Sequence, residues 1–176
     1  MEQQIVQIPS GKAIIIICGP TTCGKSSIAR RLLKVRNGKY ISYERIRNSI
    51  PKKMGKEKQV LAITKMFAQA IEKAVMSEQY VVIETPFIEE GQLSGLIVSL
   101  RIYGYKTDIT LIKVNLPENL HLDYWQRKHN PKPNKKVILQ ERATFEKGIL
   151  VTDYSKFGGV NEFTITNPNA VKYKVD

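Results

Sequence analysis

Two patterns of apolar and polar residues alternate along the chain. Short runs of apolar, often β-branched residues are typical of strands that are buried on both faces of a parallel sheet. Longer stretches in which apolar residues recur every three or four positions are typical of helices that pack on such a sheet. The strand-like runs cover residues 13–18, 39–42, 80–84, 107–115 and 161–167.

Stretches with helical spacing lie between these runs, at residues 25–35, 44–50, 59–77, 89–104, 117–129 and 137–148. Strands that alternate with helices predict an α/β fold with a parallel sheet. We therefore expect a three-layer sandwich around a mostly parallel five-stranded sheet. The expected core positions of the first and third helices are Ile28, Leu32, Val35, Leu61, Met66, Ala70 and Val75.

The length of 176 residues predicts one domain over residues 1–176, with residues 168–176 as a C-terminal tail. The longest apolar run, residues 13–18, is far too short to span a bilayer. The first ten residues lack the basic and apolar segments of a signal peptide. Cys18 ends a predicted strand and Cys23 lies in the loop that follows it, so we do not expect them to form a structural disulfide. We therefore expect a reducing compartment, the cytoplasm, and no membrane contact. The oligomeric state stays open.

The chain carries a formal net charge of +12, from 28 basic and 16 acidic residues. Such an excess favours anionic partners, which include nucleotides, nucleic acids and acidic membrane surfaces. A solubilising basic surface is an equally good interpretation, because the sequence does not show whether the charge is localised.

Residues 19–26 read GPTTCGKS and carry the G-x-x-x-x-G-K-S spacing of a phosphate-binding loop between a predicted strand and a predicted helix. The two glycines allow a tight turn whose backbone N–H groups form an anion nest. Lys25 can then reach the β- and γ-phosphates of ATP, and the Ser26 hydroxyl can ligate Mg²⁺. The expected nucleotide-binding residues are Gly19, Pro20, Thr21, Thr22, Cys23, Gly24, Lys25, Ser26 and Ser27.

Cys23 lies next to the predicted helix start, where a thiol pKa can be lowered. We favour the plainer interpretation, in which this cysteine is a small residue that fills the loop.

Three further segments offer groups that could hold a phosphate acceptor. Glu44 and Arg47 lie three positions apart at the start of a predicted helix and so share a face. Glu44 could deprotonate an acceptor hydroxyl and Arg47 could hold an acceptor phosphate. The same pair could instead be an exposed salt bridge.

Glu84 ends a buried strand, at the sheet edge where ligands of parallel sheets bind. We predict that it contacts the acceptor and the water shell of Mg²⁺ beside Ser26. A hydrogen-bonded carboxylate that caps the strand end is the alternative.

Residues 127–142 are basic and rich in proline, and they join two predicted helices, which indicates a lid over the phosphates. A cation on such a lid can stabilise the charge that develops during phosphoryl transfer. Arg127 is the first candidate for this cation, because a guanidinium binds phosphate oxygens bidentately, and Arg142 is the second. A solvated basic face accounts for several of the lysines.

Four stretches, GPTTCGKSS, ISYERIR, YVVIETPF and NLPENLHLDYWQRK, together resemble the small phosphate-loop kinases of the polynucleotide 5′-kinase and zeta-toxin type. The closest likeness is to the 5′-kinase domain of bacterial RNA-repair enzymes, over roughly residues 13–167. The resemblance implies a fold like that of nucleoside monophosphate kinases. It also implies that Lys25 and Ser26 serve ATP and magnesium, that Glu44 is the general base and that Arg47 contacts an acceptor phosphate. Arg127 or Lys128 falls near the lid arginine of this family.

The chain departs from this family in its acidic residues, at Pro86, where the family has an asparagine, and in a lid that is richer in lysine. Glu44 replaces an aspartate, and the acid of the third strand lies one residue later, at Glu84, so that it is expected on the opposite side of the strand. Three functions fit the residues. The first is a kinase of RNA or DNA 5′-hydroxyl ends, and the second is a kinase of a small acceptor such as a nucleoside, nucleotide, sugar or antibiotic. The third is a nucleotide-binding regulator without turnover.

Overall fold

The structure is a computed structural model that describes residues 4–127 and 134–175. Its main sheet has five strands, all parallel, in the order β3-β4-β2-β5-β6. The predicted α/β sandwich around a parallel five-stranded sheet is therefore confirmed. The strands are β2 (Ala13–Cys18), β3 (Lys39–Ser42), β4 (Tyr80–Glu84), β5 (Ile109–Val114) and β6 (Val160–Ile165).

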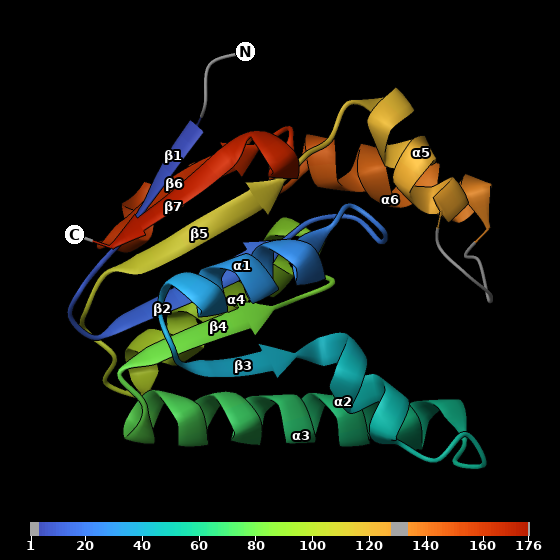
Figure 1. Cartoon of the computed structure of the whole chain (residues 1–176). Coiled ribbons are helices and arrows are strands. Elements are labelled where there is room, and N and C mark those ends of the chain that lie inside the picture. The colour runs from blue at the N-terminus through green and yellow to red at the C-terminus, as the bar shows by residue number, and fades with distance from the viewer. Residues whose placement is uncertain (1–3, 128–133, 176) are drawn as a thin grey trace.

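Helices cover both faces of this sheet, with α1 in front of it and α4 behind it in Figure 1. None of the helices within the described residues is long and apolar enough to cross a membrane. The helices are α1 (Lys25–Val35), α2 (Tyr43–Ser49), α3 (Lys56–Ser77), α4 (Glu90–Ile102), α5 (Glu118–Arg127) and α6 (Lys135–Lys147), with the short turns η1 (Ser155–Phe157) and η2 (Pro168–Ala170).

The central strand β2 shows why the sheet needs a layer on each face. All six of its residues are buried, and alternate side chains point to opposite faces. Ile14 and Ile16 pack in one core with residues of α3 and α4, while Ile15 and Ile17 pack in a second core with residues of α1. A strand without a polar face is stable only between two apolar layers.

The expected core face of α3 is partly wrong. Val75 is buried, but Leu61 is 71% exposed and Met66 is 42% exposed, whereas Ile63 and Phe67 face the core. The helix is apolar over more than half of its circumference, so spacing alone does not identify the side that meets the sheet.

On α1, the predicted core residues Ile28 and Leu32 are fully buried, while Val35 in the last turn is exposed. The prediction for Val35 was therefore wrong: the buried face of α1 ends at Leu32, and Val35 in the last turn does not belong to it.

The expected C-terminal tail is also wrong. Residues Val171–Val175 form strand β7, which pairs in parallel with strand β1 (Gln4–Ile8), as Figure 1 shows. The buried side chains of this two-stranded sheet, Val6, Ile8 and Val171, extend the core that contains α1. In β7 (VKYKV) apolar and lysine residues alternate, and the strand has only five residues, so its composition resembles that of a polar terminus.

All strands of the main sheet end at the same edge, to which the arrowheads point in Figure 1. The loop between β2 and α1, the start of α2 and the end of α5 lie at this edge. Ligands of parallel sheets bind beyond the carboxyl ends of the strands, so this edge is where a functional site is expected.

Candidate active site

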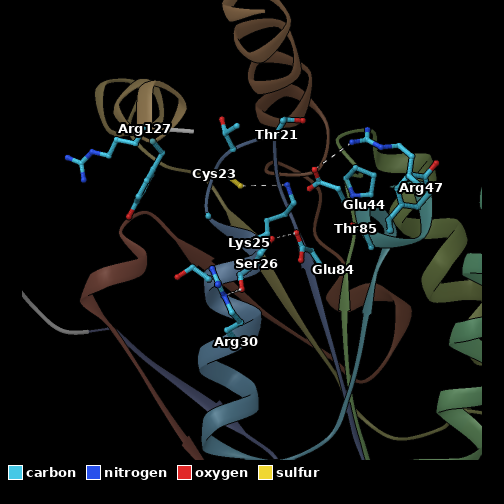
Figure 2. Close-up of a pocket in the computed structure, with 16 residues that line it drawn as sticks. Thr21, Cys23, Lys25, Ser26, Arg30, Glu44, Arg47, Glu84, Thr85 and Arg127 are labelled. Carbon is cyan, nitrogen blue, oxygen red and sulfur yellow. Dashed lines mark hydrogen bonds and ion pairs between the residues drawn. The ribbon is translucent and has the colours of Figure 1, made fainter. Parts of the chain in front are cut away.

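The phosphate loop connects β2 to α1, and its backbone depends on two glycines (Figure 2). Gly19 has φ +152°, and a Cβ there would lie 2.7 Å from the carbonyl oxygen of Val114. Gly24 has φ +93°, a left-handed conformation that side chains rarely adopt, and it directly precedes α1. Both positions therefore require glycine, as the sequence motif predicts.

Lys25 is the buried cation of this loop. Its Nζ donates hydrogen bonds to the carbonyl oxygens of Gly19 and Pro20, each at 2.8 Å. These bonds hold the ammonium group inside the loop, where a phosphate could accept from it. The geometry fits the expected contact with the β- and γ-phosphates of a nucleotide.

Cys23 is buried in the same loop, with its Sγ 4.0 Å from Lys25 Nζ. Burial raises the pKa of the Cys23 thiol, and the nearby Lys25 only partly opposes this effect. A raised thiol pKa disfavours the reactive thiolate, so the structure favours the interpretation of Cys23 as a space-filling residue.

Glu84 lies beside the first turn of α1. The sequence comparison with polynucleotide 5′-kinases predicts its side chain on the opposite side of β4 from the acid of those kinases. Its Oε1 accepts a hydrogen bond of 2.8 Å from Ser26 Oγ, and its Oε2 accepts one from the Tyr40 hydroxyl. Burial, followed by the bond to Glu84, raises the pKa of Tyr40 to about 12, so this tyrosine stays a donor at neutral pH.

A hydroxyl and a carboxylate suit Mg²⁺, which binds one or two protein oxygens and keeps the rest of its shell as water and phosphate. Ser26 and Glu84 are the residues that would hold the metal. Among the described residues no group of three or more His, Cys, Asp or Glu side chains could hold a metal.

A pocket of about 330 Å³ opens above the loop, and we call it the main pocket. It brings Glu44 and Arg47 of α2 opposite Lys25, Ser26 and Glu84. Arg47 lies 3.6 Å from Glu44, and both side chains are about half exposed. The pair is thus a salt bridge and a wall of the pocket at the same time. Besides the phosphate loop, the main pocket is lined by Arg30, Tyr43, Glu44, Arg47, Glu84, Thr85, Pro86, Tyr124 and Arg127.

Of the two predicted lid cations, Arg127 lines the main pocket and Arg142 does not. Arg127 forms an ion pair with Asp123 at 2.7 Å, and its guanidinium points away from Lys25 in Figure 2. Arg142 is not among the residues that line the pocket within the described part of the chain. It forms an ion pair with Glu146 at 2.6 Å and donates to the carbonyl oxygen of Leu116. Residues 128–133 of the expected lid lie outside the described residues.

Two residues that the sequence analysis did not identify contact the phosphate loop from helices α5 and α6. His121 of α5 is buried, and its Nε2 lies 2.7 Å from the Thr21 carbonyl oxygen. Glu141 of α6 accepts a hydrogen bond of 2.8 Å from the Thr21 backbone N–H. The next residue, Thr22, has φ +66°, which is strained for a β-branched residue. We infer that His121 and Glu141 stabilise this strained loop.

We expect acid to weaken the fold through His121. Burial lowers the pKa of His121 below its ordinary value of about 6.5. The unfolded chain therefore binds a proton at a higher pH than the folded chain, and this part of the stability is lost as the pH falls below about 6.5. In His121→Gln, the free energy of unfolding should depend less on pH between pH 7.5 and pH 5. Chemical denaturation at the two pH values measures this, and equal slopes for both proteins would contradict the role of His121.

Comparisons with known proteins agree with this geometry. No curated protein matches the chain. One chain of the Pnkp1/Rnl/Hen1 RNA repair complex has a similar fold, with a TM-score of 0.70 and 15% identity, over 82% of this chain and 47% of that chain. This chain therefore spans about half the length of that relative.

Two smaller proteins are similar over most of both chains. The tunicamycin resistance protein of Deinococcus radiodurans matches with a TM-score of 0.59 and 16% identity, over 86% of each chain. A gluconokinase from Sinorhizobium meliloti 1021 matches with a TM-score of 0.59 and 12% identity, over 90% of this chain and 86% of that chain. At such identities the likeness shows the fold, and it confirms the resemblance to small phosphate-loop kinases at that level.

The family AAA_33, described as an AAA domain, matches residues 14–147. The matched region begins in β2, contains the phosphate loop and the residues of the main pocket, and ends with α6. It covers well over half of the sequence, and so the chain belongs to the AAA_33 family of AAA domains.

Proposed function

We propose that this protein is an ATP-dependent kinase that transfers the γ-phosphate of ATP to an acceptor hydroxyl. The observation that carries the proposal is the main pocket, in which Lys25 and the Ser26–Glu84 pair face Glu44 across a space of about 330 Å³. One wall can hold a nucleotide with Mg²⁺, and the opposite wall offers a carboxylate to a hydroxyl. The two free cysteines suit a reducing compartment such as the cytoplasm.

In this proposal Glu44 accepts the proton of the acceptor hydroxyl while the hydroxyl oxygen attacks the γ-phosphorus of ATP. The bond from that phosphorus to the β,γ-bridging oxygen breaks, and ADP leaves. Lys25 neutralises charge on the phosphates, and a Mg²⁺ ion held by Ser26 and Glu84 would supply further positive charge there. Arg47 orients the acceptor. Arg127 would have to break its ion pair with Asp123 to reach the transferred phosphoryl group. Because that pair is exposed, breaking it costs little free energy.

We further propose a nucleic-acid 5′-hydroxyl end as the acceptor. The rim of the main pocket carries three arginines, Arg30, Arg47 and Arg127, and arginine suits phosphate oxygens better than lysine does. The net charge of +12 favours a polyanionic acceptor. The fold likeness to a chain of an RNA repair complex supports the same acceptor, whereas the likeness to a gluconokinase supports a small acceptor.

An acceptor competition tests the proposal. The protein is incubated with ATP labelled at the γ-phosphate, Mg²⁺, and an equimolar mixture of 5′-hydroxyl oligonucleotides, nucleosides and sugars. We expect the label on the oligonucleotides. Label on a small acceptor alone would replace the nucleic-acid acceptor with the small-molecule alternative. Nucleotide binding without any labelled product would favour the regulator.

A further inference from the structure

A second pocket of about 230 Å³ adjoins the main pocket on the side of α1 and α2, and we call it the side pocket. Ser26, Arg30 and Glu44 line both pockets, so the two spaces meet at the groups expected to carry the reaction. The other residues of the side pocket are Tyr40, Ser42, Arg45 and Asn48. The function proposed above leaves this space unused.

Two guanidinium groups define the chemistry of the side pocket. Arg30 lies one turn after Ser26 on α1, and its Nε donates to the Ser26 carbonyl oxygen at 3.2 Å (Figure 2). Arg45 lies over the ring of Tyr40, with its Cζ 4.7 Å from the ring centroid. Within residues 4–127 and 134–175, neither arginine forms an ion pair with a carboxylate.

Tyr40 limits where the Arg45 head group can go. The Tyr40 hydroxyl donates to Glu84, which fixes the ring over which the Arg45 guanidinium lies. A guanidinium held over a ring can direct its N–H edges to a ligand as a planar fork of hydrogen bonds. Such a fork matches two oxygens of a phosphate group. Ser42 and Asn48 add neutral polar groups on the same wall.

We propose that the side pocket binds a second backbone phosphate of a nucleic-acid strand whose 5′ end occupies the main pocket. This inference rests on the proposed kinase function and narrows its acceptor to strands with more than one phosphate. The first backbone phosphate lies near Arg47 in the main pocket, and a later one lies between Arg30 and Arg45. A nucleoside or a sugar leaves the side pocket empty.

Binding of strands of increasing length tests this inference. A 5′-hydroxyl dinucleotide has one internal phosphate and a tetranucleotide has three, and each is titrated in the presence of a non-hydrolysable ATP analogue. We expect the wild-type protein to prefer the tetranucleotide. Arg45→Gln should reduce that preference about tenfold, as expected for a lost hydrogen bond to a charged group. The slope of log affinity against log salt should fall by about 0.7, as for one lost phosphate contact on a single strand.

Lys34→Gln is the matched control, because Lys34 is an exposed cation of α1 that does not line either pocket. It should keep the length preference, whereas Arg45→Lys, which keeps the charge but not the planar fork, should lose part of it. Thermal melting of Arg45→Gln checks that the fold is intact. An unchanged preference in a folded Arg45→Gln protein would overturn the inference.

The outcome also separates this inference from the proposed function. If 5′-hydroxyl strands are phosphorylated but Arg45→Gln keeps the length preference, only the side-pocket site is wrong. If strands are neither bound nor phosphorylated, the nucleic-acid acceptor and the side-pocket site fail together. A sugar bisphosphate is titrated as a third ligand. If it binds more tightly than the tetranucleotide, and if Arg45→Gln weakens its binding, the side pocket binds a small bisphosphate. The inference of a nucleic-acid strand in the side pocket would then be overturned.

Discussion

Lys25→Ala should slow phosphoryl transfer by about 10²–10³-fold and weaken nucleotide binding. The Lys25 ammonium is buried and is held by two loop carbonyl oxygens at 2.8 Å, so it occupies the centre of the anion site before any ligand arrives. Removal of a preorganised charge donor of this kind costs about 10²–10³-fold in rate. Steady-state kinetics with each candidate acceptor, together with calorimetric titration of ATP and Mg²⁺, measure both effects.

Lys34→Ala is the matched control for this change. Both lysines belong to α1, but Lys34 is exposed in the last turn and lies outside the pockets. Its loss should leave activity and nucleotide affinity within error. Unchanged nucleotide affinity in Lys25→Ala would show that the loop does not bind triphosphate, and the proposed kinase would then fail at its first step.

Glu44→Gln should slow the chemical step while ATP still binds. A general base contributes about 10²–10⁴-fold to a rate. Glu44 lines the main pocket from α2, whereas the residues proposed to hold the nucleotide and its metal belong to the loop, to the start of α1 and to β4. Single-turnover transfer from bound ATP, measured by rapid quench, separates the chemical step from binding.

Glu57→Gln provides the comparison for Glu44→Gln, because Glu57 is an exposed carboxylate in the first turn of α3 as Glu44 is in that of α2. Glu57→Gln should transfer phosphate at the wild-type rate. A Glu44→Gln protein that loses ATP affinity but keeps the single-turnover rate would refute the base role. The ion pair of Glu44 with Arg47 would then be a structural contact rather than part of the chemical step.

The sequence predicts the phosphate loop and its flanking strand and helix well, because they are built from adjacent residues. The loop motif, the strand before it and the helix after it follow one another, and α1 begins and ends where its apolar spacing indicates. Glu84 is also predictable, since it ends a fully apolar strand. Even its shifted position in the strand does not keep it from Ser26, because the side chain of glutamate is long enough to form the 2.8 Å hydrogen bond.

The groups that support the loop are not predictable in this way. His121 and Glu141 contact Thr21 across about a hundred residues of sequence, and a single histidine or glutamate on an amphipathic helix has no distinctive pattern. Tyr40 can donate to Glu84 because β3 pairs with β4 in the sheet. The order of the strands along the sequence does not predict that these two strands are neighbours. The pairing of β1 with β7 depends likewise on both ends of the chain.

The fate of the γ-phosphate tests the central claim most directly. The protein is given ATP labelled at the γ-phosphate, Mg²⁺ and a 5′-hydroxyl oligonucleotide, and the labelled products are separated and identified. We expect a phosphate monoester on the 5′ oxygen of the strand, formed by the wild-type protein and formed about 10²–10³-fold more slowly by Lys25→Ala. Label that appears only as inorganic phosphate, at a rate that no acceptor changes, would contradict a kinase and would identify the site as one of ATP hydrolysis.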